Sequence, residues 1–97
     1  GKALSNALQG NTMTSIIAYG DPCTIKICAG GKLVGQAGFE NEDKDTGTWW
    51  IENDCWHRQW SRWAWGETGI YNVRQDGDII KLFDEEGWLI DRYVAQK

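Results

Sequence analysis

The sequence has little histidine, no excess of basic charge and no long apolar run. His57 is the only histidine and lies in no HxxxH or CxxC pattern, so a zinc site has poor support. The formal net charge is −4, whereas a nucleic-acid-binding surface needs a basic patch. No apolar run approaches the roughly 20 residues of a membrane-spanning helix, and no glycine-rich phosphate loop precedes a helix. We therefore expect no nucleic-acid partner, no membrane insertion and no cofactor.

Tryptophan, by contrast, is abundant, with seven in 97 residues. Six of them lie in residues 46–66, together with the only histidine and two of the four arginines. Each indole can bury roughly 150–250 Å², so few residues suffice to fill a small core. The chain length and the ordinary apolar fraction of 41% predict a single domain over residues 1–97. The tryptophan-rich segment suggests recognition more than catalysis.

The hydrophobic periodicity is helical at the start of the chain and alternating afterwards. Apolar residues at helical spacing in Lys2–Gln9, followed by Gly10, predict a short helix. Eight alternating segments follow, at residues 12–19, 23–29, 32–40, 46–53, 55–63, 69–75, 78–84 and 88–95. The pattern predicts an all-β fold, a small antiparallel up-and-down β-barrel of about eight strands with a short N-terminal helix. A barrel is favoured over a flattened sandwich because closure removes exposed edges.

Turn residues separate these segments. Asn53-Asp54 is a turn candidate, and Asp76-Gly77 predicts a two-residue type I′ hairpin turn. Gly35 and Gly38, inside one predicted strand, indicate a bend or a close approach by another backbone.

Three cysteines leave the redox state open. A strand between Cys23 and Cys28 would hold their Cα atoms about 16 Å apart, at ~3.3 Å per residue. A disulfide needs Cα atoms within about 7 Å, so we expect no Cys23–Cys28 bond. Cys55 is able to pair with one of them only if the fold brings the strands together, and three half-buried thiols are the alternative.

Several short motifs resemble a family of small bacterial exported domains of largely unassigned function. They are LxGNTM (Leu8, Gly10 to Met13), GTWW (Gly47 to Trp50), DCWxxxW (Asp54 to Trp60), DGD and a late DEEG. The resemblance implies a compact β-barrel, a periplasmic or secreted location and no catalytic residues. It also implies a second cysteine near Ile70-Tyr71 that bridges to Cys55. This chain has no cysteine there, which leaves Cys23 or Cys28 as a replacement partner.

Catalytic and metal sites have weak support. Cys55 and His57 at i, i+2 in a strand have Cα atoms about 7 Å apart, whereas a nucleophile and its base must come within roughly 3 Å. Asp43 and Asp45 suggest calcium, but Thr48 stands where an EF-hand loop requires glycine. We expect no enzyme and no metal site.

The aromatic segment supplies the candidate binding residues. Trp56, Arg58, Trp60 and Arg62 share one strand face, and we expect this face to be at least partly open to solvent. The reason is that burying an unpaired charge costs several kcal/mol. Trp49 with Ile51, and Trp88 with Ile90, are expected in the core. The predicted ligand- or partner-binding residues are Trp50, Trp56, Arg58, Trp60, Arg62 and Trp63.

The sequence therefore predicts a non-enzymatic binding or protein-interaction domain that uses a Trp/Arg-rich face. The alternative is a small-molecule carrier with its site at the barrel mouth. Its ligand would be flat or sugar-like, with an anionic group held by Arg58 or Arg62. The partner is thus a protein or a small ligand, and the oligomeric state is left open.

Overall fold

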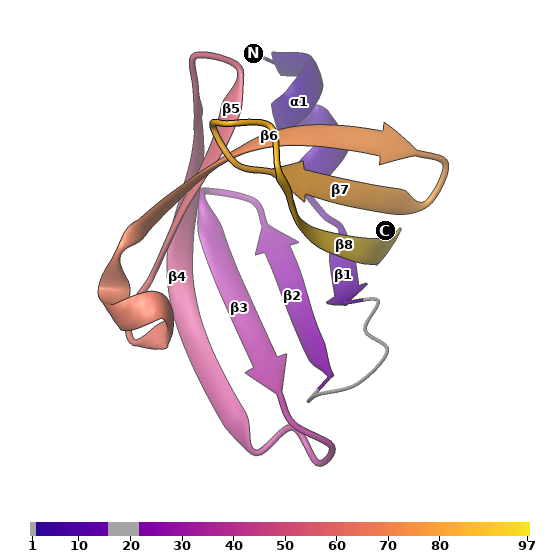
Figure 1. The fold of residues 1–97 in the computed structure, drawn as a ribbon. Coiled ribbons are helices and arrows are strands. Elements are labelled where there is room, and N and C mark those ends of the chain that lie inside the picture. The colour runs from indigo at the N-terminus through magenta and orange to yellow at the C-terminus, as the bar shows by residue number, and fades with distance from the viewer. Residues whose placement is uncertain (1, 16–21) are drawn as a thin grey trace.

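The computed structural model describes residues 2–15 and 22–97, and the described chain forms a closed antiparallel barrel of eight strands (Figure 1). Each strand pairs with its neighbours in sequence, and the first pairs with the last to close the sheet. The strands are β1 Thr12–Ser15, β2 Cys23–Cys28, β3 Lys32–Ala37, β4 Asp43–Glu52, β5 Cys55–Trp60, β6 Thr68–Asp76, β7 Ile79–Phe83 and β8 Leu89–Gln96. Helix α1 (Lys2–Leu8) precedes them, and the 3₁₀ turn η1 (Trp63–Gly66) links β5 to β6.

The predicted barrel with a short N-terminal helix is confirmed, and closure rules out the flattened sandwich. Residues 16–19 of the first predicted strand, and Gly20-Asp21 of the turn after it, lie outside the described residues. No helix in the described parts of the chain is long and apolar enough to cross a membrane.

Helix α1 covers the barrel end that carries the β2–β3 and β4–β5 turns (Figure 1). Leu8 is fully buried in the core, and Leu4 packs against the core beside it. The Gly10 N–H donates to the Ile27 carbonyl at 2.7 Å, and the Ile27 N–H donates to the Asn11 carbonyl at 2.9 Å. The buried Asn11 amide also donates to the Leu8 carbonyl at 3.1 Å, which satisfies a helix-end acceptor. These bonds fix the helix to β2, so the opposite end of the barrel is the one left for access.

The core takes inward-facing side chains from seven of the eight strands, with β6 contributing partly buried ones. Its buried members are Leu8, Met13, Ile25, Ile27, Leu33, Trp49, Trp56, Trp60, Ile80, Leu82, Tyr93 and Ala95. Along most strands the buried positions recur at every second residue, which is the side-chain period of a strand with one solvent-exposed face, although Trp56 and His57 in β5 are both buried. Two of the predicted recognition tryptophans therefore belong to the core.

The prediction that Trp88 and Ile90 lie in the core is wrong, because they are 69% and 49% exposed. The buried residues of β8 are Tyr93 and Ala95. Because strand side chains alternate between faces, Ile90 falls on the outer face of the same strand. A register shift between Leu82 and Phe83 accompanies the start of this hairpin.

The three thiols are free within the described chain. Strand β2 runs without interruption from Cys23 to Cys28, as the prediction of no bond between them requires. Neither of these two thiols replaces the partner that the family resemblance implies for Cys55. The Cys55 Sγ instead donates to Asn72 Oδ1 at 3.4 Å, across from β6.

The β6–β7 turn lies one residue later than predicted. Asp76 pairs with Ile79 inside the ladder, so Gly77 and Asp78 form the two-residue turn. Only Gly77 has a positive φ, 60°, as the first turn residue of a type II′ hairpin does, so the type I′ prediction is wrong. The Asn53-Asp54 turn is confirmed, with φ of 53° and 58°.

Replacing Gly77 by valine tests this turn. A Cβ at Gly77 meets nothing within 4 Å, so any loss of stability comes from backbone strain alone. We expect Gly77→Val to lower the free energy of unfolding by about 1 kcal/mol or more, measured by urea denaturation. Asp78→Val, at the neighbouring turn position without a positive φ, is the matched control and should change it less. Equal losses for both variants would contradict the turn assignment.

Candidate functional site

The register of the β4–β5 hairpin decides which side chains of the tryptophan-rich segment face the barrel interior. Its two-residue turn sets Trp49 opposite Arg58 and Ile51 opposite Trp56. Directly opposed residues of antiparallel strands lie on the same face of the sheet. Because Trp49 is only 6% exposed, Arg58 and Trp56 point inward with it.

The prediction that the Trp56–Arg62 face is open to solvent is wrong for both of its tryptophans. Trp56 is 0% exposed and Trp60 is 5% exposed. The prediction relied on two arginines sharing this face, but β5 ends at Trp60 and Arg62 lies on the surface. A single guanidinium, that of Arg58, therefore lies on the inward face with the indoles.

Arg58 is held among aromatic rings. Its guanidinium carbon lies 5.4 Å from the Trp56 ring centre and 4.7 Å from the Tyr71 ring centre. Its Nη2 donates to the Tyr71 hydroxyl at 3.4 Å. Burial lowers the pKa of Arg58, but the hydroxyl groups of Tyr93 and Tyr71 together outweigh burial and the net pKa is raised. Arg58 is therefore a cation, stabilised by stacking worth about 0.5–2 kcal/mol.

Two buried side-chain atoms, Trp56 Nε1 and Arg58 Nη1, have no acceptor at hydrogen-bonding geometry among the described residues, although the Tyr93 hydroxyl lies close enough to the guanidinium to raise its pKa. Leaving a buried donor unpaired costs about 1–3 kcal/mol, and more when the group is charged. Within residues 2–15 and 22–97, Arg58 also forms no ion pair with a carboxylate. Both unpaired atoms are donors, so the group that would complete them is an acceptor.

Arg58 lines a pocket of about 370 Å³ at the barrel end away from α1, which we call the mouth pocket. Its lining includes Arg58 and Trp60 from β5, Trp63 from η1, Glu67 after it, Tyr71 from β6, and Asp91 and Tyr93 from β8. The Tyr93 hydroxyl donates to Asp91 Oδ2 at 2.9 Å. Burial raises the pKa of Tyr93, so it remains a neutral phenol.

Cys23, the first residue of β2, also lines the mouth pocket. Burial raises the pKa of its thiol, Arg58 lowers it, and Asp91 and Asp43 raise it further. The net shift is upward, so Cys23 is a protonated thiol near neutral pH. The thiol lies within electrostatic reach of both Arg58 and Asp91.

A buried carboxylate on β4 holds η1 in place and so positions Trp63. Asp45 Oδ2 accepts the backbone N–H groups of Arg62 and Trp63, each at 2.8 Å, and its Oδ1 accepts that of Thr46 at 2.9 Å. The Trp63 ring centre then lies 4.7 Å from that of Trp60, with the planes at 53°. This tilted pair of indoles forms one wall of the mouth pocket.

Asp43, the other residue that suggested calcium, has side-chain partners. Arg62 Nη2 donates to Asp43 Oδ1 at 2.9 Å, and Trp63 Nε1 donates to the same atom at 3.2 Å. These hydrogen bonds lower the pKa of Asp43. In the part of the chain that the structure describes, no three histidine, cysteine, aspartate or glutamate side chains are grouped so as to hold a metal ion.

Gly35 on β3 makes room for the indole pair. A Cβ at this position would lie 2.4 Å from the Trp63 ring and 2.8 Å from the Trp60 ring. The sequence indicated a close approach at this glycine, and the approaching groups are side chains rather than a backbone. Any larger residue at Gly35 would displace the tryptophan wall.

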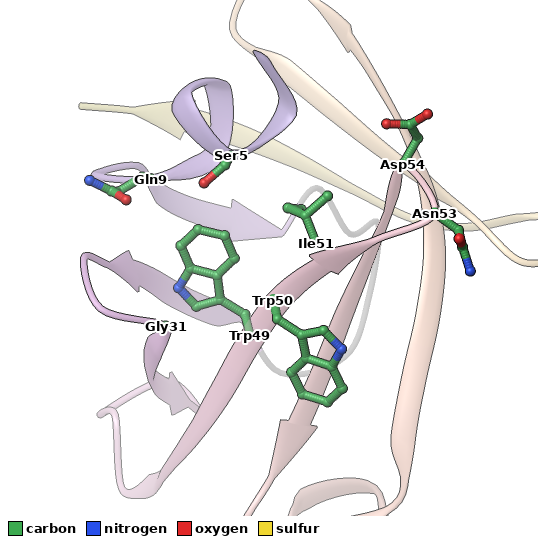
Figure 2. Close-up of a pocket in the computed structure, with 8 residues that line it drawn as sticks. All are labelled: Ser5, Gln9, Gly31, Trp49, Trp50, Ile51, Asn53 and Asp54. Atoms are coloured by element: carbon green, nitrogen blue, oxygen red, sulfur yellow. The ribbon is translucent and has the colours of Figure 1, made fainter. Parts of the chain in front are cut away.

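Trp50, another predicted site residue, lies outside the barrel. Figure 2 shows Trp49 and Trp50 on opposite sides of β4, with Trp49 directed toward α1. Trp50 stacks on His57, with ring centres 5.4 Å apart, and borders an open groove of about 640 Å³ between α1 and β4. This groove is larger than the mouth pocket, but neither unpaired buried donor belongs to a residue that lines it.

The predicted site residues therefore divide among four places. Arg58, Trp60 and Trp63 meet in the mouth pocket, Trp56 lies in the core beneath Arg58, and Trp50 and Arg62 lie on separate outer surfaces. Cys55 and His57 have separate partners, since His57 Nε2 lies 3.2 Å from the Glu52 carbonyl oxygen and Cys55 bonds Asn72.

Sequence reasoning missed Asp91 and Tyr93 as site residues. The last strand carries apolar residues on both faces, Ile90 and Val94 on one and Tyr93 and Ala95 on the other. Its alternation therefore gave no clear inward face. The one usable signal was the large Tyr93 ring, which the narrow barrel buries.

No family model, no curated protein and no solved structure matches the chain. The resemblance to exported bacterial domains stays a prediction, as does the periplasmic or secreted location that it implies.

Replacing Asp45 by asparagine tests how η1 is held. Burial raises the pKa of Asp45, but the N–H groups of Trp63, Arg62 and Thr46 lower it, and the net pKa lies below the ordinary 3.8. The ionised carboxylate therefore adds stability above pH 3.8, and this stability is lost as the pH falls through the lower pKa of the folded state. We expect Asp45→Asn to lower the free energy of unfolding by about 1–3 kcal/mol at neutral pH.

The difference from the unmodified chain should shrink as the pH is lowered below 3.8, measured by urea denaturation at each pH. Asp78→Asn, at an exposed turn position, is the control for removing one carboxylate. A difference that stays constant down to the acid limit would show that the carboxylate charge does not hold η1.

Proposed function

We propose that this chain is a non-enzymatic binding domain that holds a small anionic molecule, flat or sugar-like, in the mouth pocket. The proposal rests on Arg58, whose cationic side chain lines this pocket. Its Nη1 atom is a buried donor that has no hydrogen-bond partner among the described residues. An anionic oxygen at Nη1 would supply the missing acceptor in a charge-assisted hydrogen bond. Arg58 is thus the anion anchor of the site.

The shape and lining of the pocket support a small ligand. Its volume of about 370 Å³ falls in the usual range for small-molecule sites, about 300–1,000 Å³. The half-buried Trp63, packed on the largely buried Trp60, offers indole surface on one side, and Tyr71 and Tyr93 offer hydroxyl groups on the other. Aromatic surface with a few polar groups suits a planar or sugar-like body with one charged substituent.

The protein-interaction hypothesis, which the sequence favoured, loses the surface on which it depended. That hypothesis required Trp56, Arg58, Trp60 and Arg62 to form one exposed face. Trp56 and Trp60 are buried, and Arg62 is paired with Asp43. The small-ligand alternative therefore has the better structural support.

Nuclear magnetic resonance of the tryptophan indole N–H groups tests the proposal directly. Glucuronate and glucose are matched probes that differ in one carboxylate. We expect glucuronate to shift the Trp60 and Trp63 signals saturably, and glucose to leave them in place. Arg58→Gln should weaken glucuronate binding by about 10- to 100-fold, the value of a hydrogen bond to a charged group.

Arg62→Gln is the matched control, because it removes the same charge from an arginine in the same segment that does not line the pocket. We expect it to bind glucuronate like the unmodified chain. Equal weakening by both variants would assign the effect to net charge. If no probe with an anionic group, whether glucuronate, benzoate, phosphate or a zwitterion, shifts the indole signals of the unmodified chain, the proposed function is wrong.

A further inference from the structure

The mouth pocket carries charges of both signs that do not neutralise each other directly. Arg58, Asp91 and Glu67 all line it. Among the described residues, no ion pair joins Arg58 to Asp91 or to Glu67. A cation and a carboxylate that share a pocket without pairing present two separate charged groups to whatever enters.

Tyr93 lies between these two charges. Its hydroxyl donates to Asp91 Oδ2, which uses one of the several acceptor sites of that carboxylate. Arg58 lowers the pKa of Tyr93 and Asp91 raises it, and the Cys23 thiol responds to the same two groups in the same directions. Tyr93 and Cys23 line the mouth pocket together with Arg58 and Asp91, so both lie within electrostatic reach of the two charges.

This charge pattern disfavours a ligand that is only anionic. Such a ligand would approach Arg58 next to Asp91 and the exposed Glu67. The two carboxylates would repel its anionic group while one guanidinium attracts it. A ligand with an additional cationic group would find complementary charges on both sides of the pocket.

We propose, on the premise that the function above is correct, that the ligand of the mouth pocket is a zwitterion. Its anionic group binds Arg58 Nη1, its cationic N–H group binds Asp91, and the body between them lies against Trp63. Amino acids and amino sugars with an acid group have this chemistry. Asp91 is then a specificity-determining residue and Arg58 is the anchor.

Three matched probes test the inference by the same indole signals near neutral pH: 4-(aminomethyl)benzoate, 4-methylbenzoate and benzylamine. We expect the zwitterionic probe to bind about tenfold more tightly than 4-methylbenzoate, the value of one further charge-assisted hydrogen bond. Benzylamine should bind most weakly. The pair of 5-aminopentanoate and pentanoate repeats the comparison with a flexible body, so the result does not depend on one spacing.

Asp91→Asn should reduce the preference for the zwitterion to about one, without weakening 4-methylbenzoate binding, while Glu67→Gln should keep the preference. The preference of the unmodified chain is decisive by itself, so the conclusion does not depend on how well a variant folds. If the anion-only probes bind as tightly as the zwitterions or more tightly, and their binding still depends on Arg58, the zwitterion proposal is wrong and the proposed function stands. If no probe binds in an Arg58-dependent way, Arg58, Tyr93 and Asp91 form a structural network only, and both proposals fail.

Discussion

The inward position of Arg58 is the constraint on which the rest of the site depends. The β4–β5 register sets Arg58 opposite the buried Trp49, so its side chain points inward and its guanidinium lies against aromatic rings. Stacking on Trp56 and Tyr71 offsets part of the desolvation, at about 0.5–2 kcal/mol for a cation–π contact. Nη1 remains without a hydrogen-bond partner among the described residues, which costs the folded state stability.

The surroundings of Arg58 are built by residues that do not touch it. Asp45 fixes η1 through two backbone N–H groups, which brings Trp63 against Trp60. Gly35 leaves the space that this indole pair occupies. At the other end of the barrel, α1 is bonded to β2 and covers the core with Leu8. One end of the barrel is therefore occupied by a helix, and the other carries the pocket.

Much of the fold followed from local patterns, whereas the site depended on long-range pairing. Alternation and turn residues predicted the helix, the strands and their closure, and the Asn53-Asp54 turn was assigned correctly. That same turn already implied that Trp49 and Arg58 share a face. The cost of burying a charge had predicted instead that Arg58 faces solvent. The strand pairing places it inside the barrel, where aromatic rings stabilise the guanidinium. The size of the Tyr93 ring indicated its burial, but the place of Tyr93 and Asp91 beside Arg58 comes from tertiary closure and not from any local pattern.

The most direct test of this account is a crystal structure of the chain in sodium bromide, with bromide located by its anomalous scattering. The account predicts a bromide ion inside the mouth pocket, within hydrogen-bonding distance of Arg58 Nη1. A structure in which bromide lies only at outer residues such as Arg62, while a protein carboxylate pairs with Arg58 Nη1, would contradict it.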